Sequence, residues 1–174
     1  MLKENLIHQT LKGIPKDYSV IEKMVMPYRD QGGSMIIIDD GLANELDGTV
    51  AKMFEQLSNN GKCSIIFVTQ NLFIDQGFYR CMASQCQYVN MMYSPRSMIE
   101  LRNLAMQITQ CNIKFVVDSY KDASKLKKTV NGDVSYGYLF FDLKTSPYFN
   151  PLTILRTNLF DEKDPIAVYK ENEC

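Results

Sequence analysis

Runs of apolar residues alternate along the chain with amphipathic segments, and this alternation predicts a layered α/β domain. Residues 35–38 form a continuous apolar run followed by two aspartates, and residues 64–71 form a second run that ends in polar residues. Because neither run alternates with polar positions, we expect two strands with both faces covered. Between them, apolar residues at helical spacing predict an amphipathic helix over residues 44–58, which ends at an Asn-Asn-Gly turn.

The same patterns predict the elements that flank this pair. Further helices are expected over residues 17–30, 97–110 and 118–128, the first of them capped by Asp17 or Ser19. Further strands are expected at residues 87–94, 137–143, 153–160 and 166–169. The second and third of these strands are predicted to form an antiparallel hairpin, and the fourth an edge piece. Residues 112–120 are ambiguous, and the basic segment that begins at Lys125 is expected to be a solvated connection.

Composition narrows the class of protein. A chain of 174 residues with 45% hydrophobic and 22% charged content is typical of one globular domain. Nineteen basic and twenty acidic residues give a net charge of -1, so any contact with DNA must be local. His8 is the only histidine, which leaves little material for histidine chemistry or a histidine-rich metal site.

Cysteine usage and hydropathy bear on localisation. The five cysteines are odd in number and lack the paired spacing of a zinc site, so we expect reduced, mostly buried thiols. No stretch resembles a signal peptide or approaches the ~18 apolar residues of a membrane span. The sequence therefore predicts an intracellular protein, in the nucleus or cytoplasm of a host, with no membrane partner.

Polar side chains follow both apolar runs. Asp39 and Asp40 come directly after the first run, and Thr69, Gln70 and Asn71 end the second. Ligands of open α/β sheets bind at the carboxyl ends of the strands, where one acid can orient magnesium and a second can polarise the attacking water. The structural alternative is two aspartates that end a strand and an amide that caps a helix or turn.

The order of these motifs resembles a known family. The strings IIIDDGL, SIIFVTQNLF, QYVNMMYSPRS, YGYLFFDL and LRTNLF are similar to the carboxy-terminal portion of packaging ATPases of the FtsK-HerA superfamily. Relatives of this kind occur in poxviruses and in adenovirus-like or transposon-derived DNA viruses of animals. The resemblance covers residues 13–169. It implies an α/β fold with a three-layer P-loop NTPase core of the RecA/ASCE-like kind, truncated at its amino-terminal side and ending in a β-hairpin.

The resemblance also implies a domain and roles for the strand-end residues. Residues 1–174 would be a single partial P-loop ATPase domain, with a core at about 13–160 and a polar tail at 161–174. Asp39 would bind the cofactor and hold Mg²⁺, Asp40 would be the catalytic acid, and Gln70 would sense the phosphate. Many relatives have glutamate at the position of Asp40.

Two arginines match arginines of the family. Arg80 would be catalytic, and Arg96, together with Asn71, would bind the nucleotide. The resemblance equally allows both arginines to act at a subunit interface. The alternative for each arginine is a surface salt bridge. Relatives carry a basic or histidine pair before the second strand, a source of the arginine finger. Here only Lys62 could substitute, and lysine lacks the planar fork of arginine.

The larger departure from the family is the phosphate loop. The motif G-x-x-x-x-G-K-[ST] does not occur, because Cys63 follows Gly61-Lys62 and Gln56 stands where the first glycine should be. Without a cradle of backbone N–H groups, nothing in these residues neutralises the β- and γ-phosphates. We expect a truncated, fragmentary or degenerate motor that neither binds ATP tightly nor hydrolyses it alone.

Three functions from different classes remain open. The first is a packaging ATPase remnant, whose complete form would use ATP and Mg²⁺, assemble as a homo-oligomeric ring, associate with virions and translocate double-stranded DNA. The second is a non-catalytic α/β interaction or regulatory module. The third is a metal-dependent phosphotransfer or nuclease domain that uses Asp39, Asp40 and Asp142.

Overall fold

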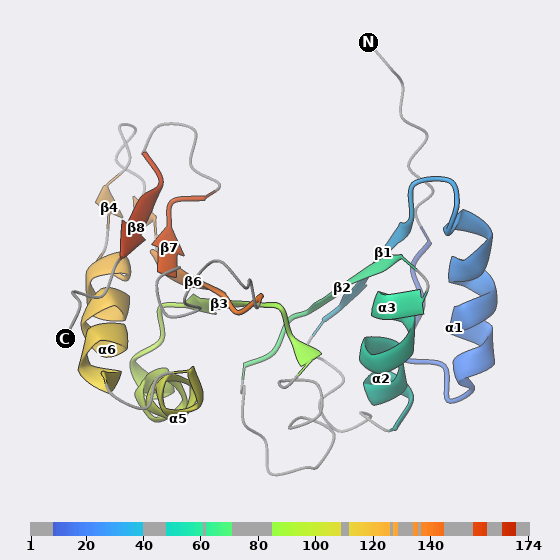
Figure 1. Ribbon diagram of the computed structural model, residues 1–174, viewed down its shortest axis with the longest axis horizontal. Coiled ribbons are helices and arrows are strands. Elements are labelled where there is room, and N and C mark those ends of the chain that lie inside the picture. Colours follow the sequence, from blue (N-terminus) through green and yellow to red (C-terminus); the bar gives the residue numbers. More distant parts are fainter. Residues whose placement is uncertain are drawn as a thin grey trace. The chain divides into compact units, whose positions relative to one another are not determined.

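The protein has a mixed α/β fold, which confirms the predicted class at this level (Figure 1). The computed structural model describes residues 9–39, 48–60, 62–70, 85–108, 112–125, 127–128, 134–135, 137–144, 155–159 and 165–169. The chain divides into two compact units, Met1–Gln85 and Cys86–Cys174. The prediction of a single domain is not tested by this division and stays a prediction.

The first unit begins with a short capped helix. Helix α1 spans Tyr18–Val25 and continues into the 3-10 turn Met26–Tyr28. The backbone N–H of Ser19 donates to the Asp17 carboxylate at 2.9 Å, so Asp17, one of the two predicted candidates, is the N-cap. Ile21 and Val25 are buried. The helix itself is shorter than the predicted range of 17–30.

A second helical segment confirms the described part of the predicted amphipathic helix. It consists of α2 (Gly48–Lys52), the π-helical turn Met53–Leu57 and α3 (Ser58–Asn60), while residues 44–47 lie outside the described residues. Its buried apolar side chains are Val50, Met53, Phe54 and Leu57. The hydroxyl of Thr49 donates to the backbone oxygen of Lys16 at 3.0 Å, which ties this segment to the residues before α1.

The two apolar runs form a parallel pair of strands. Strands β1 (Ser34–Ile38) and β2 (Cys63–Phe67) pair from Ser34↔Cys63 to Ile38↔Phe67. The expectation that both faces are covered is wrong, because burial alternates along both strands. The helices of this unit lie on one side of the pair (Figure 1). The other face exposes the side chains of Met35 (62%), Ile37 (64%), Ile66 (44%) and Val68 (48%).

The second unit contains a four-stranded antiparallel sheet. Its order is β3-β6-β7-β8, with β3 at Tyr88–Met92, β6 at Tyr138–Asp142, β7 at Leu155–Thr157 and β8 at Ala167–Tyr169. The antiparallel pairing of β6 with β7 confirms the predicted hairpin, and β8 lies at the edge as predicted. Leu139, Phe141 and Leu155 are almost completely buried and form the core beneath this sheet.

Two packed helices accompany this sheet. Helix α5 spans Met98–Ile108 after the 3-10 turn Pro95–Ser97, within the predicted range of 97–110, and it buries Leu101, Leu104 and Ala105. Helix α6 spans Ile113–Ala123 and packs against both α5 and β6.

The predicted bounds of α6 are wrong by about five residues at each end. The helix begins earlier because Asn112 caps it, its side-chain oxygen accepting from the Phe115 N–H at 3.1 Å. Beyond α6, the basic segment predicted to be a solvated connection contains strand β4 (Lys127–Lys128), which pairs with β5 (Val134–Ser135). The prediction from charge overlooked this pairing, whose two strands lie close together in the chain.

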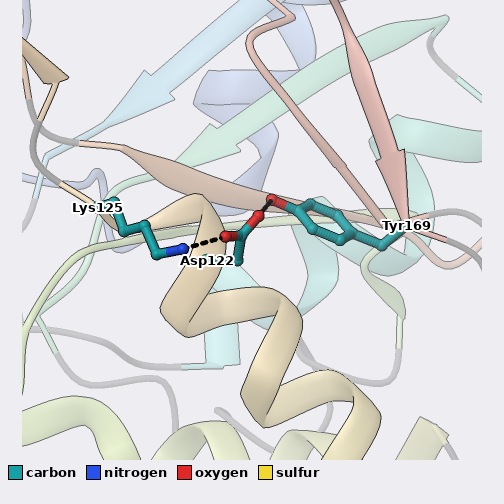
Figure 2. A network of polar contacts seen from close by, with 3 residues as sticks. All are labelled: Asp122, Lys125 and Tyr169. Atoms are coloured by element: carbon teal, nitrogen blue, oxygen red, sulfur yellow. Dashed lines mark hydrogen bonds and ion pairs between the residues drawn. The ribbon is translucent and has the colours of Figure 1, made fainter.

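A polar network joins the edge strand β8 to α6 (Figure 2). The Tyr169 hydroxyl donates to one oxygen of Asp122 at 2.9 Å, and Lys125 Nζ pairs with the other oxygen at 2.5 Å. Partial burial of the ring and the bond to the carboxylate raise the pKa of Tyr169 to about 12. The raised pKa means that the neutral, donating phenol is the form that the folded state favours.

This network predicts a loss of stability at alkaline pH. A folded-state pKa above the ordinary value of about 10 adds stability that is complete below pH 10 and is lost as the pH rises towards about 12. We expect Tyr169→Phe to be less stable than the wild type at pH 8, and the difference to shrink between pH ~10 and ~12. Urea unfolding of both proteins across this range measures it. A difference that stays constant with pH would contradict the role of the phenol.

Candidate functional site

The carboxyl ends of β1 and β2 meet at one edge of the parallel pair. Asp39 is the first residue after β1, and the backbone N–H of Val68 donates to the Ile38 oxygen at 2.9 Å. The pairing of the two chains therefore continues one residue beyond β2. Because parallel strands point the same way, Asp39 and the Thr69-Gln70 segment lie at the same end of the pair.

The side chains at this edge are accessible to solvent. Asp39 and Gln70 are exposed and Thr69 is half-buried. The alternation along β1 places Asp39 on the same face as Met35 and Ile37, which is the exposed face of the pair. Carboxylate and amide oxygens are hard ligands of the kind that Mg²⁺ takes, so these groups suit the magnesium side of a nucleotide site.

The predicted site residues fall into three groups. The structure brings Asp39 and Gln70 to the same edge, in agreement with the predicted neighbourhood of the two strands. Asp40, Asn71 and Arg80 lie outside the described residues. Arg96 is an exposed residue of the 3-10 turn before α5, in the second unit. The roles assigned to all of these residues stay predictions.

Lys62, the candidate substitute for an arginine finger, lies at the opposite end of the parallel pair from Asp39. It directly precedes β2, and its amino group pairs with Asp30 at 3.9 Å. Both side chains are largely exposed, so the pair adds little stability. Within its own chain, Lys62 is thus at the amino-terminal edge, away from the strand ends where Asp39 lies. A role in a neighbouring subunit stays a prediction.

Asp142, the third acid of the nuclease hypothesis, has partners on its own sheet. Its carboxylate lies 3.7 Å from the Arg156 guanidinium on the adjacent strand and accepts from the Lys144 N–H at 3.2 Å. Among the residues that the structure describes, no group of three or more His, Cys, Asp or Glu side chains is arranged to hold a metal ion. The visible contacts of Asp142 thus fit an acid that ends a strand.

Two cysteines bear on the predicted thiol state. Cys63 is buried at the start of β2 and Cys86 is half-buried, and both are free thiols. Burial raises the pKa of both thiols, which keeps them protonated and poorly reactive near neutral pH. Cys63 is therefore buried as expected, whereas Cys86 is only half-buried, and the reduced state of the thiols stays a prediction. The other three cysteines lie outside the described residues.

Sequence reasoning missed one buried polar connection. Tyr120 of α6 is 1% exposed, and its hydroxyl donates to the Met92 oxygen at 3.0 Å and accepts from the Ser94 N–H at 2.9 Å. This tyrosine fixes the segment after β3 against α6, beside a cavity of about 520 Å³. The helical spacing of apolar residues from Ile113 onwards was the available signal for this helix.

Comparison with known proteins found no relative of this chain. No family model matches the chain, and neither a curated protein nor a solved structure matches it. Within the described ranges, none of the helices combines the length and the apolar character that a membrane crossing requires.

Proposed function

We propose that the chain is the magnesium-side part of a P-loop ATPase of the packaging type, whose complete form has a three-layer core and translocates double-stranded DNA as a ring. One observation carries this proposal: the parallel pairing of β1 and β2 brings Asp39 and Gln70 to one strand-end edge. A helical segment, residues 48–60, lies between the two strands in the chain. A strand, a helix and a parallel strand form the unit from which nucleotide-binding sheets are built.

The residues at this edge have distinct tasks in the proposed site. Asp39 would hold Mg²⁺, Asp40 would accept the proton of the attacking water, and the Gln70 amide would donate to a γ-phosphate oxygen. The magnesium ion, when bound, would neutralise charge on the β- and γ-phosphates. The phosphate cradle would come from residues outside this sequence, which contains no G-x-x-x-x-G-K-[ST].

We therefore expect weak metal–nucleotide binding at this edge and no turnover by residues 1–174 alone. The test uses Mn²⁺ as a paramagnetic substitute for Mg²⁺, added with ATP to the isotope-labelled protein. Amide signals of residues 38–39 and 68–70 should broaden selectively. Asp39→Asn should weaken the metal effect by about tenfold or more, because it removes a ligand of the ion.

Asp30→Asn is the matched control for this experiment. Asp30 is an exposed aspartate near the opposite end of the same pair, where it contacts Lys62. Its substitution should leave the broadening at residues 38–39 unchanged. Equal broadening in the wild type and in Asp39→Asn would contradict the proposed metal site. Rapid ATP hydrolysis by residues 1–174 would contradict the missing-cradle part of the proposal.

A specific observation also favours the second candidate, a non-catalytic interaction module. Four apolar side chains are exposed on one face of the β1–β2 pair, three of them on the strands and the fourth at Val68, directly after β2. Exposed apolar faces of this kind commonly mark contact surfaces. A module of this kind would give no selective broadening at the Asp39 edge. The manganese experiment therefore separates the two candidates.

A further inference from the structure

The second unit contains a half-open cavity of about 520 Å³, next to the carboxyl end of α6. Its volume lies within the range of small-molecule sites, roughly 300–1,000 Å³. The segment after β3 supplies an apolar wall through Tyr93, Pro95 and Met98. Tyr120 of α6 and the C-cap residue Ser124 line the opposite side of the cavity, and both residues are buried. All of these residues belong to the same compact unit.

Ser124 provides an unused hydrogen-bonding group at this cavity. The residue is 5% exposed, and its hydroxyl has no hydrogen-bond partner among the described residues. A buried hydroxyl without a partner is unfavourable, and native structures satisfy most such groups. Because a hydroxyl both donates and accepts, a polar ligand edge would satisfy it once rotation of the Ser124 side chain turns the buried oxygen toward the cavity.

Two lysines line the outer part of the cavity. Lys121 is in the last turn of α6 and Lys125 directly follows its C-cap, Ser124, and both line the cavity. Both are exposed. Lys125 pairs with Asp122, whose second oxygen accepts from Tyr169 (Figure 2). Within the described part of the chain, Lys121 has no carboxylate at ion-pair distance, which leaves its charge available to an anion.

The electrostatics of the helix end set the orientation of a ligand. The last carbonyl groups of α6 carry partial negative charge, which disfavours an anion deep in the cavity and favours N–H groups there. The lysines favour an anion at the outer part. A suitable ligand has a flat apolar body with a polar N–H edge and a phosphate at its other end. We propose that this cavity binds a nucleoside monophosphate, its base against Tyr93 and Met98 and its phosphate at Lys121.

Asp122 provides a test that separates phosphate binding from a purely structural role of these residues. Its carboxylate lies beside Lys125 and would repel a phosphate as well as compete with it for the lysine. Removing this charge should therefore tighten binding of a phosphate, whereas removing the Lys121 charge should weaken it. The two substitutions act in opposite directions on one affinity.

The experiment is an NMR titration of the full 174-residue chain with AMP, in parallel with phenyl phosphate, adenosine and inorganic phosphate. AMP should shift the amides of residues 93–98 and 120–125 and bind more tightly than inorganic phosphate or adenosine. Lys121→Gln should weaken AMP by about 2- to 5-fold and Asp122→Asn should tighten it by a similar factor. Ser124→Ala should weaken AMP but not phenyl phosphate, which has no polar edge to reach the hydroxyl.

Lys114→Gln is the matched control, because Lys114 is an exposed lysine near the other end of α6 that pairs with Asp118. It should leave the AMP affinity unchanged. The proposal is overturned if AMP leaves these amides unmoved at ~10 mM, if inorganic phosphate binds as tightly as AMP, or if Asp122→Asn weakens AMP. These readouts lie in the second unit, so their failure is distinct from failure at the Asp39 edge in the first.

Discussion

Gly137→Ala is expected to destabilise the second unit by about 3 kcal/mol, the upper end of the usual cost of overpacking. A Cβ at Gly137 would lie 1.8 Å from the backbone oxygen of Ala123 and 3.2 Å from the Cα of Ser124. Backbone atoms cannot rotate away as a side chain can. The carboxyl end of α6 would have to move from β6, and Ala123 is buried there.

Urea unfolding with hydrogen exchange resolved by residue measures this effect. The free energy of unfolding should fall in the second unit, where amides of α6 and β6 should exchange faster. Amides of β1 and β2 in the first unit serve as an internal control and should keep their protection. A loss below about 1 kcal/mol would contradict the close approach of Gly137 to α6.

Gly33→Ala is expected to destabilise the first unit by about 2–3 kcal/mol, because two costs combine at this position. The φ of Gly33 is +87°, a conformation that side chains rarely adopt, and an added Cβ would lie 2.5 Å from the backbone oxygen of Lys62. The same oxygen accepts from the Ser34 N–H at 3.4 Å, at the start of the β1–β2 pairing. The substitution should therefore also disturb the strands that position Asp39.

Gly32→Ala separates the two costs. Gly32 has a φ of +110°, but an added Cβ would meet no atom within 4 Å, so only the backbone strain of about 1 kcal/mol applies. Chemical denaturation of both variants gives the difference, which measures the clash with Lys62. Equal losses in the two variants would contradict the close backbone approach at Gly33.

Local periodicity was sufficient to predict several elements. The hairpin of β6 and β7, the edge strand β8 and the helix α5 follow from patterns within short segments. The cap at Asp17 follows from the chemistry of a side chain beside the first free N–H groups of a helix. The order of the strand-end residues predicted which side chains could share one edge, and the parallel pairing places Asp39 and Gln70 there.

The tertiary structure alone decided three other features. The exposed face of β1 and β2 depends on which helices pack on the strands, and an apolar run does not encode that. The Tyr120 contacts join residues that are distant in the chain, as does the cavity beside Ser124. The sequence by itself therefore determined the local elements and the polar residues at their ends. Contacts between distant segments required the fold, because their energies depend on packing that no local pattern records.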